Sequence, residues 1–588
     1  MRSKHPSLPA LLLALALLLT ACQSGSDGSQ EPGEAEAPPF VVTAALQDGG
    51  GAVLAHHLYE NLMRWVDGGD GFAVLAPGQA ESYTVETDYA GCATYTFTLR
   101  DDIQWSDGRA VTAEDFAAAW RRLADPAMSG LSGHDRMALV SGFDQVQETG
   151  DTGLLAVSAP DKRTFVVTLS GPGSLFLEEL CASADTMPLR TDLLTAAGEM
   201  TGTVTNGPYV LREAGGSVLV RSETYYDARS VGPDELHFAA PTGSQSDYEK
   251  LLGGQLDLLQ GLPGQRLQEL ADSGAWLPDP VTSVYGVLFN TQTPPFDSAE
   301  VRQAFQLAVD EAAVAEALAD LTLRPAAGLI PYGVDDHSAQ RPDSGEAEEE
   351  PVLPDPNAPA PAEEPAVYWD FRTHSQALVT QTEEGDYASD CLRAKALMAQ
   401  AGYASGGGFP VVEYLYVASD ANRAAAQALQ AMWREQLGVT VTLRGVTQEE
   451  YDAALHPAAE DGEDSGGEDG NTAAFNMAAQ DFTALFNDAE SLLSRWHSAS
   501  AENAAGYRSD AFDILMDSAA AAISPEAADA RDAYLHDAEA ILLSDAAVIP
   551  LYFRGTSCQL SDSLTGLYRA PNGLYFLSAL RPADGAAS

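Results

Sequence analysis

Two adjacent histidines, His56 and His57, are the residues that come nearest to metal chemistry in this chain. An α-helix has 3.6 residues per turn, so neighbouring side chains on it point about 100° apart. The two imidazoles therefore do not converge on one ion. No cluster of further histidines accompanies them, and we expect no metal at this position.

Sequence patterns that carry catalysis are absent. The chain has no HExxH, GxSxG or GxxxxGK pattern and no compact pairing of cysteine with histidine. Four cysteines follow Cys22 at wide spacings and without a CxxC pair, so we expect no structural zinc. They are Cys92, Cys181, Cys391 and Cys558. Disulfides and free thiols are both open for these four. We expect a protein that is not an enzyme and holds no cofactor.

Acidic side chains gather in two stretches that do not have the composition of a folded core. Residues 335–366 are crowded with Pro, Glu, Asp and Ala, and residues 457–471 with Glu, Asp and Gly. The second stretch lacks the spacing and the closing glutamate of an EF-hand loop, so calcium binding is not favoured. We interpret both as disordered, solvated insertions on the surface.

The N-terminus predicts export. A basic start precedes an apolar run from Leu8 to Leu19, which is too short to span a membrane. The sequence Leu-Thr-Ala-Cys that ends at Cys22 resembles the bacterial lipobox, whose cysteine is lipidated; the alternative is a plain secretory signal. We therefore expect a lipoprotein signal peptide at 1–22, and a flexible tether rich in Ser, Gly, Glu and Pro at 23–39.

Charge and length limit the class of protein. The formal net charge is −55, and such a surface repels nucleic acid and anionic lipid headgroups. It fits a soluble, monomeric body outside the cytoplasm. A chain of 588 residues is too long for one hydrophobic core, so at least two lobes are expected.

Strands and helices are mixed along the chain, which indicates an α/β protein. Residues 94–99 alternate between polar and apolar, as a half-buried strand does. Thr112 can cap a helix whose apolar stripe is formed by Phe116, Trp120 and Leu123. Residues 421–437 predict another helix, which Gly438 ends before a strand begins.

Several motifs occur in an order that resembles one family. The strongest is LRDDIQWSDG at 99–108, which continues as VTAEDF at 111–116. The others are LYENL at 58–62, NGPYVL at 206–211, YYD at 225–227, GQLD at 254–257, FN at 289–290, PF at 295–296, VRQA at 301–304, GY at 402–403, QLGV at 436–439 and VIPLY at 548–552. Together they resemble the large peptide-binding proteins of ABC importers, which include oligopeptide-, dipeptide- and nickel-binding members.

The resemblance implies a two-lobed clamp of the periplasmic-binding-protein type (type II-like), with an accessory domain and a hinge between the lobes. The implied ranges are 40–65, 201–280 and 550–588 for lobe one, 66–200 for the accessory domain, and 281–549 for lobe two. The crossings between lobes are expected near 281–290 and 546–550. Ligand would lie between the lobes, and hinge motion would close them over it.

The resemblance also implies the function and some of the contacts. The protein would capture a peptide and deliver it to the transmembrane subunits of an ABC permease. The turn at Asp48, Gly49 and Gly50 would offer backbone groups to the peptide, and Tyr285 would line the cleft near the hinge. The alternatives are a carrier of a nickel complex or haem, and a sensor lipoprotein of the same fold without a transporter.

One segment departs from the family pattern. Oligopeptide-binding members have a stretch resembling GWxADYxxPxSFL, whose aspartate pairs with the α-ammonium group of the peptide. Here Phe482 matches the aromatic residue and Phe486 the tyrosine, but Leu485 replaces the aspartate. Ala479 stands where some members have an arginine. Asp481, at the family's glycine, is a candidate for the missing charge. Otherwise the ligand is N-blocked, cyclic or not a peptide, or Asp481 is only a solvated carboxylate.

Overall fold

The structure is a computed structural model, and residues 40–588 form one compact unit. The residues that it describes are 38–47, 51–68, 73–89, 91–131, 133–171, 173, 175–195, 203–273, 279–326, 328–331, 334, 387–455, 475–484, 487–500, 502–522, 527–570 and 573–583. None of the helices among these residues is long and apolar enough to cross a membrane. The signal peptide, residues 23–37 of the tether and the two acidic insertions lie outside the described residues.

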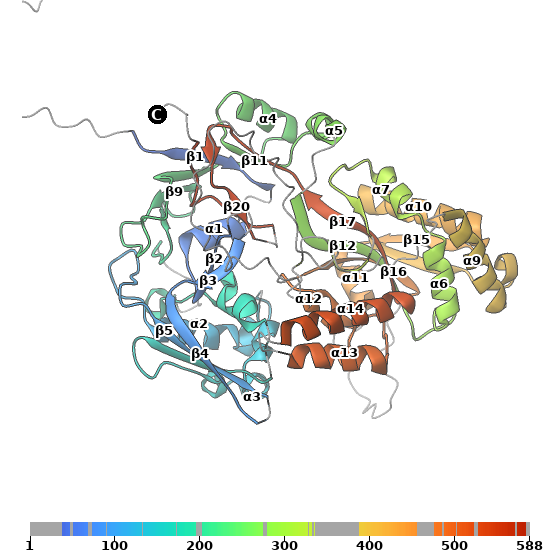
Figure 1. The fold of residues 1–588 in the computed structure, drawn as a ribbon, viewed down its shortest axis with the longest axis horizontal. Coiled ribbons are helices and arrows are strands. Elements are labelled where there is room, and N and C mark those ends of the chain that lie inside the picture. Colours follow the sequence, from blue (N-terminus) through green and yellow to red (C-terminus); the bar gives the residue numbers. More distant parts are fainter. Residues whose placement is uncertain are drawn as a thin grey trace, which may run out of the picture. The chain divides into compact units, whose positions relative to one another are not determined.

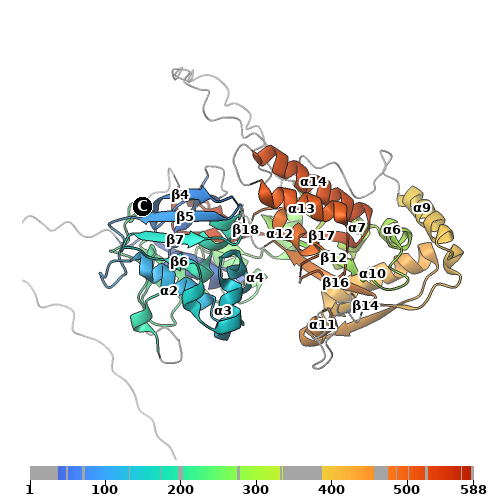
Figure 2. The ribbon, with the colours of Figure 1, turned by 90° about the horizontal axis from the view of Figure 1, so that it is seen from below.

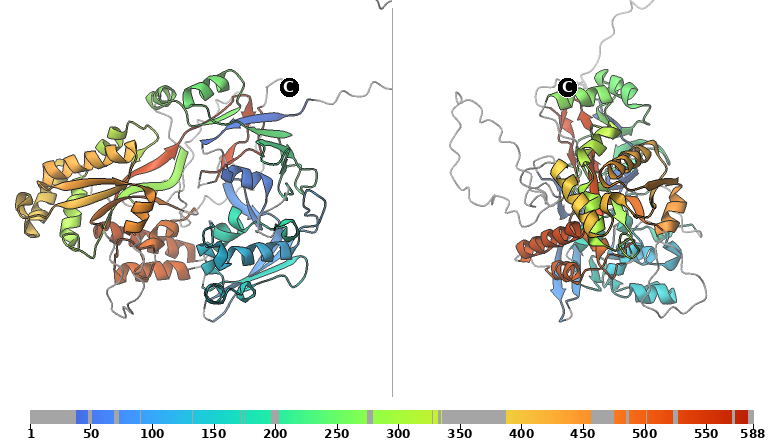
Figure 3. Two further views of the ribbon diagram at one scale, coloured as in Figure 1. Left: turned by 180° about the vertical axis from the view of Figure 1, so that it is seen from behind. Right: turned by 90° about the vertical axis from the view of Figure 1, so that its right-hand side faces the viewer.

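The first sheet joins stretches of chain that are far apart in the sequence. Its six strands run in the order β18-β11-β1-β10-β9-β8, and β1 is parallel to both of its neighbours. The strands are β1 (Val41–Ala45), β8 (Tyr209–Leu211), β9 (Val218–Arg221), β10 (Glu235–Phe238), β11 (Leu258–Gln260) and β18 (Cys558–Leu560). Helix α1 (Gly51–Leu58) follows β1, while α4 (Ser244–Leu252) and α5 (Gly264–Asp272) lie beside β11 (Figures 1 and 3).

The second sheet is buried on both faces, as the contrasting sides of β12 (Asp279–Phe289) show. Tyr285, Val287 and Phe289 pack into one core, and Val284 and Leu288 into another. The strand order is β13-β17-β12-β16-β14-β15. The other strands are β13 (Arg324–Pro325), β14 (Val412–Val417), β15 (Val441–Val446), β16 (Met477–Thr483) and β17 (Val548–Thr556).

Helices cover the two faces of this second sheet (Figure 1). The first core is completed by α6 (Ala299–Leu307), α7 (Glu311–Leu318), α9 (Tyr387–Gln400) and α10 (Asp420–Leu437). The second core is completed by α11 (Gln448–Leu455), α12 (Glu490–Leu493), α13 (Asp510–Ala521) and α14 (Ala528–Ser544). Gly438 ends α10 with φ of 73°, a left-handed conformation that glycine adopts without a steric penalty, as the sequence predicts.

The third main sheet has the order β4-β5-β7-β6, and α2 and α3 lie along one of its faces (Figure 2). Its elements are β4 (Ala80–Thr87), β5 (Ala93–Leu99), α2 (Ala113–Leu123), α3 (Phe143–Thr149), β6 (Val157–Ser158) and β7 (Thr164–Thr168). The predicted alternation in β5 is confirmed, because Tyr95, Phe97 and Leu99 are all buried. The predicted cap is also present: the Thr112 N–H donates to the Asp115 carboxylate at 2.9 Å.

Three small two-stranded sheets complete the structure. They pair β2 (Met63–Asp67) with β3 (Ala73–Pro77), β19 (Leu564–Thr565) with β22 (Arg581–Pro582), and β20 (Tyr568–Arg569) with β21 (Tyr575–Phe576). The four cysteines after Cys22 are free thiols, so the question that the sequence leaves open is decided against disulfides.

The chain passes between the first two sheets next to β12 and β17. Strand β17 remains paired with β12 as far as Thr556, and β18 joins the first sheet from Cys558. This crossing therefore follows Thr556 instead of lying near 546–550, where the sequence analysis expects it. Strand β17 stays in the second sheet for as long as its hydrogen-bond ladder with β12 continues.

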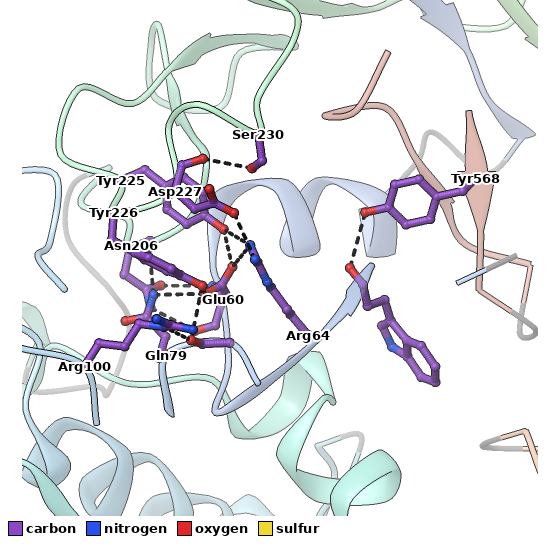
Figure 4. A network of polar contacts seen from close by, with 12 residues as sticks. Glu60, Arg64, Gln79, Arg100, Asn206, Tyr225, Tyr226, Asp227, Ser230 and Tyr568 are labelled. Carbon is purple, nitrogen blue, oxygen red and sulfur yellow. Dashed lines mark hydrogen bonds and ion pairs between the residues drawn. The ribbon is translucent and has the colours of Figure 1, made fainter. Parts of the chain in front are cut away.

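Three of the motifs found in the sequence meet at one buried residue, Glu60 in LYENL, through its carboxylate and its backbone (Figure 4). It accepts hydrogen bonds from the hydroxyl groups of Tyr225 and Tyr226, the latter at 2.8 Å. The side chain of Asn206, in NGPYVL, donates to the Glu60 carbonyl oxygen at 2.8 Å. Arg64 lies 3.7 Å from the carboxylate. Burial raises the pKa of Glu60, although the charge of Arg64 acts in the opposite direction.

Candidate ligand-binding site

The structure describes three of the residues that the sequence proposes for ligand contact. Tyr285 lies on β12, and Asp481 and Phe482 lie on the neighbouring strand β16. The others are Asp48, Gly49, Gly50, Leu485 and Phe486, which lie outside the described residues. Contacts by these five stay predictions.

Tyr285 and Asp481 belong to one cluster across three strands. Tyr285 is directly opposite Asp481 on one side and Tyr552 of β17 on the other. The rings of Tyr285 and Tyr552 are stacked, with centroids 5.0 Å apart and planes 10° apart. The Arg554 guanidinium carbon lies 5.7 Å from the Tyr285 centroid and 5.8 Å from that of Tyr552, within cation–π range.

Asp481 is held by an ion pair with Arg554. The Arg554 Nε donates to Asp481 Oδ1 at 2.6 Å, and Nη2 donates to Oδ2 at 2.9 Å. The Arg554 side chain is 38% exposed and that of Asp481 42%. Burial acts to lower the pKa of Arg554, but the hydrogen bonds and charge of Asp481 outweigh it, so this pKa is raised. Both side chains of the pair are therefore reachable by solvent.

Sequence reasoning missed Arg554. The sequence held a signal for it, because Arg554 comes two residues after Tyr552 and follows a run of apolar and aromatic residues in the same strand. Alternation along a strand puts residues two apart on the same face. The partner, Asp481, lies 73 positions away in the sequence, so only the register of the sheet brings the two together.

Phe482 faces the opposite side of the sheet from Asp481. Its ring is 1% exposed and lies 5.6 Å from the ring of Trp496. The guanidinium carbon of Arg495 also lies 5.6 Å from the Phe482 centroid. In this conformation the Phe482 side chain packs β16 against helices.

His57 has a structural role, and both of its ring nitrogens have backbone partners. Its Nδ1 lies 2.7 Å from the Val53 carbonyl oxygen, and the Leu577 N–H donates to Nε2 at 3.0 Å. An imidazole that accepts at Nε2 is neutral and carries its proton on Nδ1. Among the described residues, no three His, Cys, Asp or Glu side chains are placed to hold a metal ion.

Burial of His57 makes the free energy of unfolding depend on pH. Burial lowers the pKa of His57 to about 4 from an ordinary value of 6.5. Below pH 6.5 the unfolded chain takes up a proton that the folded protein does not bind until about pH 4, so stability falls across this window. At pH 5 we expect the lowered pKa of His57 alone to have reduced the free energy of unfolding by about 2 kcal/mol relative to neutral pH.

The variant His57→Gln should therefore lose less stability between pH 7 and pH 5 than the wild type. Urea unfolding at the two pH values measures this difference. His237→Gln is the matched control, because His237 is partly exposed and paired with Glu235. Equal pH dependence in the wild type and in both variants would contradict the assignment.

Comparison with known proteins places this chain among solute-binding proteins. Residues 74–504 match the family described as bacterial extracellular solute-binding proteins, family 5 Middle. The chain is 24% identical to the oligopeptide-binding protein OppA of Bacillus subtilis, over 98% of this chain and 99% of that protein. It is 28% identical to the probable deoxycholate-binding periplasmic protein YgiS of Escherichia coli, over 87% and 85%.

The fold is that of a solved periplasmic binding protein. The unliganded open form of the periplasmic murein tripeptide binding protein MppA superposes with a TM-score of 0.68. The match covers 93% of this chain and 98% of that one, at 21% identity. The α/β sheets described above are thus arranged as in the two-lobed solute-binding proteins.

Proposed function

Because the chain belongs to the bacterial extracellular solute-binding proteins of family 5, we propose that it binds a peptide and delivers it to an ABC-type permease. The observation that carries this proposal is the match to the Bacillus subtilis oligopeptide-binding protein, which extends over nearly the full length of both chains. A match of that extent includes the lobes, the hinge strands and the segment around Asp481. The role is binding and transfer, without catalysis.

The proposal includes the place of the protein in the cell. The lipobox-like sequence ending at Cys22 supports lipidation of this cysteine, with residues 23–39 as the tether of a monomeric body. Several acyl chains on one residue give stable anchoring to the membrane surface. The bound peptide would then be presented to the transmembrane subunits at that surface.

A melting experiment tests peptide capture. The protein is unfolded and refolded to remove ligand carried through purification, and its melting temperature is recorded with and without peptide pools of about two to eight residues. A ligand at 100 times its Kd adds about 2.7 kcal/mol to the free energy of unfolding. We expect a rise of several degrees. No rise in any pool, for a protein shown to be refolded, would contradict peptide binding.

A second candidate ligand is an amphipathic carboxylate of the bile-acid type. The match to YgiS, whose name describes it as a probable deoxycholate-binding protein, favours it over the nickel and haem alternatives. Deoxycholate in the same melting experiment separates the two candidates. Stabilisation by deoxycholate but by no peptide would favour this second function.

A further inference from the structure

The ion pair between Asp481 and Arg554 leaves part of the guanidinium unused. An arginine side chain has five N–H donors in a rigid planar fork. Asp481 takes one from Nε and one from Nη2. Three remain, and two of them, on Nη1 and Nη2, form the end of the fork. Among the described residues no acceptor contacts Nη1, and the side chain is 38% exposed.

The guanidinium is held in place before any ligand arrives. Asp481 fixes one edge of its plane, and the stacked rings of Tyr285 and Tyr552 lie under the group. Both rings are almost fully buried, at 2% and 1% exposure, so the surface beneath the guanidinium is rigid. A side chain that is already ordered loses little conformational entropy when it binds a partner.

The position of the pair along the chain places it beside the expected ligand site. Asp481 lies two residues before the end of β16 at Thr483, and in the sequence this strand precedes the segment in which the family resemblance implies recognition of the ligand's ammonium group. Arg554 lies two residues before the end of β17 at Thr556, where the chain passes to the first sheet. Both side chains are therefore at the hinge end of the second sheet.

The charge of the pair disfavours an ammonium group here. An aspartate alone would present one negative charge, whereas Asp481 with Arg554 presents none. A cation placed near Asp481 would also be repelled by the fixed guanidinium. A carboxylate meets the opposite situation, because it matches the free end of the fork with two parallel hydrogen bonds.

We propose that Arg554 binds a carboxylate of the ligand through its free Nη1–Nη2 edge, and that Asp481 is a positioning residue that aims this edge. The inference rests on the proposed function, and it specifies the class of peptide: one that brings a carboxylate, instead of a free ammonium group, to this end of the cleft. The carboxylate is either the C-terminus of the peptide or an acidic side chain.

The test measures Kd by calorimetry for matched N-acetylated peptides. One pair differs only in a C-terminal carboxylate or amide, and a second only in Glu or Gln near one end, which distinguishes the two sources of the carboxylate. We expect the wild type to bind one acidic peptide about 10- to 100-fold more tightly than its neutral partner. Arg554→Gln should abolish this ratio, because the acidic peptide loses the guanidinium that its carboxylate binds.

Three further variants separate recognition from structure. Arg554→Lys keeps the charge without the fork and should retain part of the ratio. Asp481→Asn should reduce the ratio without reversing it. If Asp481 only stabilised the fold, its replacement would leave this ratio unchanged. Arg444→Gln, which removes another exposed arginine paired with a carboxylate, should leave the ratio unchanged. Melting curves confirm that each variant is folded, since an exposed pair contributes little stability.

Two results would overturn the inference while peptide binding itself stands. One is an equal weakening of acidic and neutral peptides by Arg554→Gln. The other is tight binding of free-amine peptides that Asp481→Asn selectively removes, because Asp481 would then read the ammonium group directly. If the folded wild type binds no peptide of either charge, the proposed function fails and the inference fails with it.

Discussion

Replacement of Arg531 by methionine is expected to lower the free energy of unfolding by about 3–5 kcal/mol. Arg531 lies on α14 and binds Asp488 through two hydrogen bonds, at 2.7 and 2.9 Å, and Glu490 through a third at 2.6 Å. Its side chain is 5% exposed and that of Asp488 is 1% exposed. The variant leaves a buried carboxylate facing an apolar side chain, and the ion pair that offset much of the desolvation of its charge is lost.

Urea unfolding followed by tryptophan fluorescence measures this loss. Arg444→Met is the matched control, because Arg444 is 50% exposed and pairs with Glu413 at 3.2 Å on the surface of the second sheet. We expect the control to change stability by less than about 1 kcal/mol. A loss of similar size in both variants would show that the contribution of Arg531 to the free energy of unfolding does not come from its burial.

The second large effect is expected at Glu60. In Glu60→Ala the hydroxyl groups of Tyr225 and Tyr226 lose their shared acceptor, and Arg64 loses one of its two carboxylate partners. Because Tyr225 is buried and Tyr226 and Arg64 are partly buried, we expect a loss of about 3–5 kcal/mol. Glu60→Gln keeps one acceptor oxygen and should lose less.

Unfolding in urea again gives the measurement, with Glu249→Ala as control. Glu249 is exposed on α4 and accepts a single hydrogen bond from Gln245 one turn away. Its removal should cost no more than about 0.5 kcal/mol. If Glu60→Ala were as stable as this control, the meeting of the three motifs at Glu60 would have no structural weight.

Local patterns in the sequence were sufficient for local structure. The alternation in 94–99 predicted β5, and the Thr112 cap with the stripe of Phe116, Trp120 and Leu123 predicted α2. In both segments the residues that determine the element are within a few positions of one another. Hydrophobic periodicity and capping depend on the same short distances along the chain.

The tertiary contacts were out of reach for the opposite reason. Tyr226 is 166 positions from Glu60, and Arg554 is 73 positions from Asp481. The motifs LYENL, NGPYVL and YYD are far apart in the sequence, and nothing in them indicates that they meet at one glutamate. Likewise Asp481 was a candidate for the missing charge, while the arginine that neutralises it became visible only through the register of β12, β16 and β17.

The most direct test of peptide capture is to identify what the protein retains when several ligand classes compete. Ligand-stripped, refolded protein is mixed with a protein digest, bile acids, haem and a nickel chelate at equal concentrations. It is then washed and denatured, and the released molecules are identified by mass spectrometry. We predict that peptides are retained in excess, with acidic sequences enriched. Retention of any other class in their place, or of none, would contradict the assignment as a peptide-binding protein.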